Sequence, residues 1–156
     1  MLVRPRTSPH QPLQQFPDYS EERILAAQGY RRVAGIDEAG RGSWAGPLVA
    51  AAVCLPSPEE QTYEMLSGVR DSKQLSPKQR EELFPRILEC AVDVGVGIIS
   101  PYTIDRLGLT RSGELAMLWA VEELSIQPDY LLIDAFLLRS CNLPQRPIVH
   151  GDSLSL

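Results

Sequence analysis

The sequence lacks any uninterrupted apolar run near the roughly 20 residues that a membrane-spanning helix needs. Its first residues carry arginines and prolines without an apolar block behind them, so no secretory signal is expected. Cysteine is also scarce. Cys54, Cys90 and Cys141 form no CxxC or Cys/His cluster, which argues against a disulfide framework and a zinc site. We therefore expect a cytoplasmic protein with reduced thiols and no contact with a membrane.

Positive charge is in short supply. The chain has 15 Lys and Arg against 20 Asp and Glu, which gives a formal net charge of −5 and a pI near 5.0. Such a protein is poorly suited to binding nucleic acid through a basic surface alone. Acidic residues gathered around divalent cations could attract phosphate instead, because bound ions reverse the local sign of the field.

Length and composition predict one globular domain. A chain of 156 residues with 44% apolar and 22% charged residues fits a single core. Residues 1–20 combine four prolines with polar residues, so we expect a poorly ordered N-terminal extension there. The domain itself is expected to cover residues 21–156.

Hydrophobic periodicity predicts a mixed α/β fold. A short helix over residues 21–29 should end on a glycine, followed by elements in the order β-β-α-β-α-β-β, the first two strands forming a hairpin. The expected strands are residues 32–37, 48–55, 91–99, 130–134 and 147–150.

Two further helices are expected. Ser76 can cap the first of them, with Pro77 in its first turn and Gln79 completing a capping box. Pro85 should bend or interrupt that helix. The other helical region covers residues 104–119, with a core-facing stripe clearest from Leu115 onward and with Trp119 in the core.

Acidic residues end three of the predicted strands. Asp37 and Glu38 follow the first strand, Asp134 ends another, and Asp152 follows the last. Carboxylate oxygens are natural ligands for Mg²⁺ and Mn²⁺, and two such ions ~4 Å apart could assist phosphodiester hydrolysis. The alternative is that these residues cap turns and face water, and spacing alone does not choose between the two.

The turn after Asp37 contains Gly40, Arg41 and Gly42. Glycines let backbone N–H groups approach a phosphate closely, and arginine adds a forked, permanently charged donor. A tight turn after a strand also needs glycine for steric reasons alone. The tripeptide by itself therefore leaves a phosphate site and a plain turn equally open.

Four segments of the chain resemble motifs of type II ribonucleases H, in the family's order and over about residues 29–156. They are IDEAGRGSWAGPLVAAAV beginning at Ile36, DSKQLSP beginning at Asp71, YLLID beginning at Tyr130 and GDSLS beginning at Gly151. The resemblance implies an α/β, RNase H-like fold with a mixed central β-sheet flanked by helices.

The resemblance also implies a function. Family members cut the RNA strand of RNA–DNA hybrids, including single ribonucleotides embedded in duplex DNA, by two-metal-ion catalysis with Mn²⁺ or Mg²⁺. The products would carry 3′-hydroxyl and 5′-phosphate ends. Ribonucleotide excision repair and DNA replication would be the setting, and we expect a monomer whose partner is the hybrid or ribonucleotide-containing duplex.

Residue roles carry over by motif. The metal-binding and catalytic carboxylates would be Asp37, Glu38, Asp134 and Asp152. The residues that read the ribonucleotide and its junction with DNA would be Gly40, Arg41 and Gly42, where the 2′-hydroxyl distinguishes RNA from DNA. Ser72 and Lys73 would contact the substrate backbone, with a solvated loop as the alternative.

The chain departs from the family pattern in places. Ser43-Trp44 replaces the commoner Pro-Leu, a change that we expect to be tolerated, and His150 stands where lysine is common. Family members continue beyond the last motif into C-terminal helices that are missing here, which leaves Asp152 four residues from Leu156. We therefore expect an incomplete domain.

Three other functions remain open from the sequence. The first is a catalytically weak hybrid-binding fragment of the same fold, because of the missing helices. The second is a sugar or acyl kinase-like domain, which also uses a strand aspartate followed by glycines but needs phosphate loops that are missing here. The third is a type III ribonuclease H, whose extra N-terminal domain has no room in this chain.

Overall fold

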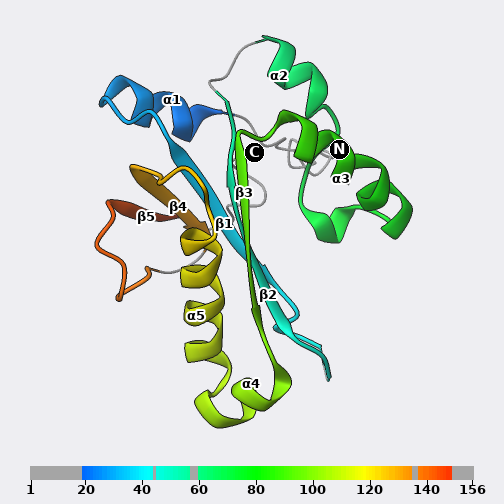
Figure 1. Cartoon of the computed structure of the whole chain (residues 1–156). Helices are drawn as coiled ribbons and strands as arrows, with labels where there is room; N and C mark the ends of the chain where they lie inside the picture. The colour runs from blue at the N-terminus through cyan, green and yellow to red at the C-terminus, as the bar shows by residue number, and fades with distance from the viewer. Residues whose placement is uncertain (1–18, 44, 57–59, 135–136, 149–156) are drawn as a thin grey trace, which may run out of the picture.

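The computed structural model describes residues 19–43, 45–56, 60–134 and 137–148. Its strands form one five-stranded sheet in the order β3-β2-β1-β4-β5 (Figure 1). The strands are β1 (Val33–Ala39), β2 (Leu48–Cys54), β3 (Asp93–Ile99), β4 (Tyr130–Asp134) and β5 (Gln145–Ile148). The helices are α1 (Ser20–Ala27), α2 (Glu60–Met65), the 3-10 helix η1 (Ser72–Gln74), α3 (Pro77–Cys90), α4 (Pro101–Leu107) and α5 (Leu109–Glu122). None of these described helices is long and apolar enough to cross a membrane.

The sheet is mixed, as expected. The β1 strand pairs antiparallel with β2, which in turn pairs antiparallel with β3, so the predicted hairpin is confirmed. On its other side β1 runs parallel to β4, which runs parallel to β5. The register places Ile36 opposite Ile133. The carboxyl ends of β1 and β4 therefore lie next to each other.

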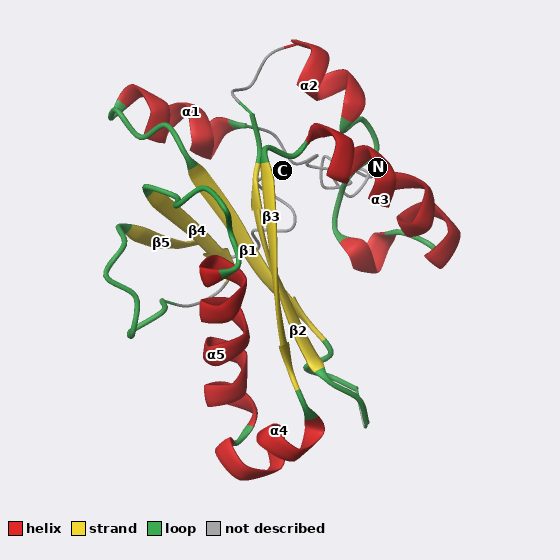
Figure 2. Cartoon of the chain, in the orientation of Figure 1, coloured by secondary structure: helices red, strands yellow, loops and turns green. Residues whose placement is uncertain are grey.

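One face of the sheet is covered by α5 (Figure 2). Along β2, every second residue is buried on this face, beginning with Leu48 and ending with Cys54. The helix presents Ala116, Met117 and Ala120 to the sheet, all of them fully buried. The small side chains of Ala116 and Ala120 let the helix and the strands approach closely, as dense core packing requires.

Two glycines of β3 are needed for this close packing. A Cβ added to Gly97 would lie 1.9 Å from the Ala116 carbonyl oxygen, and one added to Gly95 would lie 2.0 Å from the Ala120 carbonyl oxygen. Both obstacles are backbone atoms, so a side-chain rotation cannot relieve the overlap. The alternation of small and β-branched residues in this segment predicted the strand. The small residues of that pattern, Gly95 and Gly97, are the ones that contact α5.

The α4 helix packs Ile104 against this core, whereas α1 and α3 contribute to two other clusters. A second cluster joins Tyr19, Leu66 and Cys90, with Ile87 of α3 packed against it. The α1 helix covers Leu132 and Ile148 through Leu25. As predicted, α1 is followed by a glycine, Gly29, whose φ of 99° is suited to the end of a helix.

Several details of the helices differ from the prediction. The capping box of Ser76 with Gln79 is present, but α3 continues unbroken through Pro85. Pro85 is exposed, so water can hydrate the carbonyl that loses its partner. The region 104–119 is two helices, because Gly108, with φ of 77°, separates α4 from α5.

The prediction that Trp119 lies in the core was wrong, since its side chain is 42% exposed. In α5 the sheet-facing positions are Ala116 and Ala120, one turn apart, and Trp119 is rotated off that face. Two short elements were also missed within the expected loop, namely α2 and η1.

We predict that Gly97→Ala destabilises the fold by about 3 kcal/mol or more, because the new methyl group meets backbone of α5. Gly35→Ala in β1, which is separated from β3 by β2, is the matched control. Its nearest obstacle is the Val53 carbonyl oxygen at 4.0 Å, and we expect a change within about 1 kcal/mol. Urea unfolding of the two variants measures both values. Equal free energies of unfolding would contradict the packing described for α5.

Candidate metal centre and phosphate-binding turn

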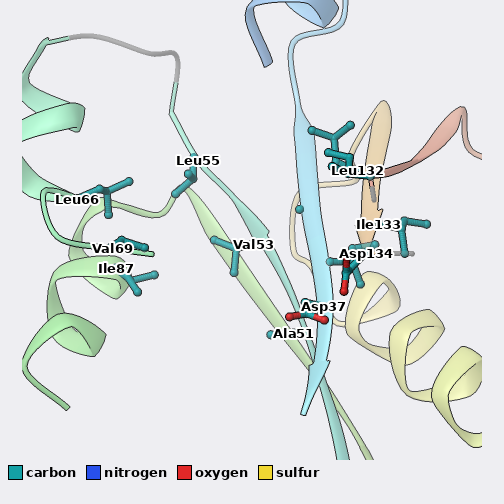
Figure 3. A pocket seen from close by; sticks show the side chains of 13 residues that line it. Asp37, Ala51, Val53, Leu55, Leu66, Val69, Ile87, Leu132, Ile133 and Asp134 are labelled. Atoms are coloured by element: carbon teal, nitrogen blue, oxygen red, sulfur yellow. The ribbon is translucent and has the colours of Figure 1, made fainter. Parts of the chain in front are cut away.

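Two predicted carboxylates come together at the carboxyl ends of adjacent parallel strands. Asp37 and Asp134 are each the next residue after the paired positions Ile36 and Ile133, so they occupy neighbouring places in the register. Paired strands lie about 4.8 Å apart. Figure 3 shows both side chains at one pocket, which both residues line.

The pocket lies on the sheet face opposite α5 and has a volume of about 270 Å³. Its lining is otherwise glycine, alanine and aliphatic side chains. The sheet supplies one wall, including Ala51 and Val53 of β2, and the opposite wall comes from Leu66, Val69 and Ile87 (Figure 3). The two aspartates are the only acids among the lining residues that the structure describes.

Asp37 and Glu38 are adjacent in sequence but point to opposite faces of β1, because side chains alternate along a strand. The Asp37 side chain shares the pocket face with Gly35. Its Oδ1 accepts the backbone N–H of Glu38 at 2.7 Å. The Glu38 side chain is only 10% exposed and accepts a hydrogen bond from Arg41 Nη1 at 2.9 Å.

The turn after β1 is held by its own hydrogen bonds. The Gly40 carbonyl oxygen accepts both the backbone N–H of Ser43, at 3.2 Å, and the Ser43 hydroxyl, at 2.7 Å. Gly40 has φ of 96°, and a Cβ there would lie 2.7 Å from the Pro47 carbonyl oxygen. Gly42 has neither constraint, with nothing within 4 Å of an added Cβ. Arg41 and Gly42 are both exposed.

Ser72 and Lys73 lie in the 3-10 helix η1, exposed and outside the pocket lining. The Asp71 side chain accepts the backbone N–H of Lys73 at 2.8 Å. Arg80 of α3 donates to the carbonyl oxygens of Ser72, at 2.9 Å, and Leu75, at 2.7 Å. This segment is therefore a structured turn tied to α3, where sequence reasoning expected a loop.

The structure thus unites two of the four predicted carboxylates. Among the described residues, no group of three or more His, Cys, Asp or Glu is placed to hold one metal ion. Asp152, His150 and Trp44 lie outside the described residues. The Asp37 and Asp134 oxygens fit a hard divalent cation such as Mn²⁺ or Mg²⁺, because carboxylates are the ligands that these ions prefer.

Some residues that shape the site were not found from the sequence. The aliphatic wall from Leu66, Val69 and Ile87 has no chemical signature, and its segments are distant from Asp37 in the chain. Ser43 and Arg80 act by bonding to backbone carbonyls, which composition and motif do not reveal. Only the capping signal at Ser76 located α3 in advance.

The cysteines take no part in this site. None of the three forms a disulfide, as expected. Burial raises the pKa of the Cys54 thiol to about 11, with the Asp93 and Asp129 carboxylates adding to the effect. This thiol is therefore neutral near pH 7 and is a poor nucleophile.

The sheet order and the paired strand-end aspartates define a protein with the ribonuclease H-like fold. The crystal structure of ribonuclease H2 from Pyrococcus horikoshii OT3 matches with a TM-score of 0.65 and 30% identity, covering 78% of this chain and 64% of that one. The crystal structure of Bst-RNase HIII in complex with Mn²⁺ shares the fold, with a TM-score of 0.61, 21% identity and coverage of 96% and 53%. The predicted fold class is confirmed.

The family follows from sequence comparison. A family model described as ribonuclease HII matches residues 34–152. Ribonuclease HII of Roseiflexus castenholzii is 52% identical over 136 residues, which are 87% of this chain and 61% of the relative. That of Chloroflexus aurantiacus is 46% identical over 141 residues, or 90% and 66%. The chain belongs to the ribonuclease HII family, and it spans less than two thirds of the length of these two relatives.

We predict that the two glycines of the turn respond differently to substitution. Gly40→Ala should destabilise the protein by about 2 kcal/mol, because its positive φ and the Pro47 carbonyl both oppose a side chain. Gly42→Ala should stay within about 0.5 kcal/mol of the parent. Thermal unfolding of both variants checks this. A similar loss in both would show that the turn differs from the one described.

Proposed function

We propose that this chain is an endoribonuclease that hydrolyses the RNA strand of RNA–DNA hybrids, including single ribonucleotides embedded in duplex DNA. The observation that carries the proposal is the in-register pair of Asp37 and Asp134, which lies close in sequence to a glycine-rich turn bearing Arg41. Membership of the ribonuclease HII family supports it. Ribonucleotide excision repair and DNA replication, in the cytoplasm, are the proposed setting.

The carboxylates are proposed to hold Mn²⁺ or Mg²⁺. Asp37 and Asp134 would bind the cation through side-chain oxygens, with Glu38 and Asp152 as the further ligands. The Mn²⁺ complex of the RNase HIII neighbour supports this class of ion. When bound, two such ions activate water and stabilise the leaving oxygen in phosphodiester hydrolysis, giving 3′-hydroxyl and 5′-phosphate ends.

The turn after β1 is proposed to bind the nucleic acid. The Gly40 geometry fixes the turn, and Gly42 is exposed with open space around it, so a sugar or phosphate can approach the backbone there. Arg41 would contact a phosphate, and backbone groups would read the 2′-hydroxyl. Ser72 and Lys73 would add contacts to the sugar–phosphate backbone of the substrate. We propose that the protein acts as a monomer.

We predict that Asp37→Asn and Asp134→Asn each lower the cleavage rate by about 100-fold or more, which corresponds to ~3 kcal/mol of transition-state stabilisation. The assay uses a labelled DNA duplex with one ribonucleotide, with Mn²⁺ or Mg²⁺. Glu123→Gln is the matched control, because it also removes one negative charge but lies exposed just after α5. We expect it to cleave at the parent rate.

Metal removal gives a second test on the same substrate. EDTA should abolish cutting, and excess Mn²⁺ or Mg²⁺ should restore it, while an all-DNA duplex should stay intact. Folded protein that binds the ribonucleotide-containing duplex without cutting it would refute the enzymatic proposal for this chain and favour a hybrid-binding fragment. Cutting that survives both aspartate substitutions would refute the assignment of the site.

A further inference from the structure

The Glu38 carboxylate is bound to an arginine and does not join the other acids. Arg41 Nη1 lies 2.9 Å from Glu38 Oε1, and the Glu38 side chain is 10% exposed against 43% for Arg41. Asp37, Glu38 and Asp134 are all described, yet they do not form a group that could hold one ion. Side-chain alternation along β1 and the bond to Arg41 together keep the third carboxylate outside the aspartate pair.

The same arginine belongs to the turn proposed to meet phosphate. A carboxylate as buried as that of Glu38 needs a positive partner, and a guanidinium is a strong donor for both carboxylate and phosphate. Arg41 thus has two possible anionic partners, Glu38 within the chain and a phosphate of the nucleic acid. Glu38 likewise has two possible cationic partners, Arg41 and a divalent ion.

Local structure leaves room for this exchange. Glu38 is the next-to-last residue of β1, and the pairing of β1 with β4 ends two residues earlier, at Ile36. Among the described strands, β2 alone pairs with Glu38, through Ala50. The Arg41 side chain lies beyond the strand in an exposed turn. Both partners of the ion pair are therefore at the open end of β1.

We propose that Arg41 and the divalent cation compete for the Glu38 carboxylate, and that nucleic-acid phosphate draws Arg41 away and so releases Glu38 to the cation. The inference rests on the proposed function, which supplies the metal and the substrate. Metal binding and nucleic-acid binding are then coupled, and the coupling is reciprocal. The complete site forms only when both are present.

The experiment measures the affinity of the protein for Mn²⁺ alone, by calorimetry and by electron paramagnetic resonance of the free ion. Each protein is titrated without nucleic acid and with a saturating all-DNA duplex, which offers phosphates but no ribonucleotide to cut. We expect the duplex to tighten Mn²⁺ binding by the parent by about fivefold or more. Arg41→Ala should bind Mn²⁺ about threefold to fivefold more tightly than the parent without the duplex. The duplex should tighten Mn²⁺ binding by Arg41→Ala less than it tightens binding by the parent, and the difference should be the same threefold to fivefold.

A double-mutant cycle separates the ion pair from a general effect of charge. In a Glu38→Gln background, Arg41→Ala should leave Mn²⁺ affinity unchanged, because the carboxylate that the arginine held is gone. Arg86→Ala, which removes an exposed arginine of α3, should have no effect in either background.

The outcomes are distinguishable. Parent protein that binds no Mn²⁺ would overturn the proposed function and this inference together. Mn²⁺ binding that needs Asp37 but is unchanged by Arg41→Ala would overturn the inference alone and leave the proposed function standing. If Arg41→Ala raises Mn²⁺ affinity equally in the parent and in the Glu38→Gln background, the inference is likewise overturned, because the removed positive charge alone then explains the change.

Discussion

The candidate site depends on the register in which β1 runs beside β4. At the start of both strands, the Asp129 carboxylate accepts the backbone N–H groups of Arg31 and Arg32, and the Asp129 N–H donates to the Arg32 carbonyl oxygen. Five residues further along each strand stand Asp37 and Asp134. A slip of one residue would turn one aspartate to the opposite face. The bonds at Asp129 therefore help to fix the distance between two carboxylates at the other end of the strands.

A second constraint makes the two faces of the sheet differ, because one packs against α5 and the other lines the pocket. Glycines at positions 95 and 97 and alanines at 116 and 120 bring α5 against the strands on one face, which buries most of the core there. The other face is free of that helix, so its side chains can line a pocket. The acids are tolerated on this second face because Asp37 remains exposed and Asp134 half-buried.

The sequence predicted those features that depend on local signals. Strand periodicity located the hairpin, and the run of Ser76, Pro77 and Gln79 located the start of α3. The pairing of Asp37 with Asp134 could be expected because parallel strands end at the same edge. Glu38 shows where this reasoning stops, because adjacency suggested one cluster, whereas strand alternation sends its side chain to Arg41. The exposure of Trp119 likewise depends on which face of α5 packs against the sheet, and no local sequence pattern predicts that face.

The proposed function requires an acidic chain to attract a polyanion. With a formal net charge of −5, the protein as a whole repels nucleic acid. Attraction must therefore be local, and it has two sources in the proposal, the cation held by the aspartates and the guanidinium of Arg41. While Glu38 occupies that guanidinium, its charge is largely neutralised. In the proposal, a cation that recruits Glu38 makes the Arg41 guanidinium available to phosphate, so each positive charge becomes available because the other is present.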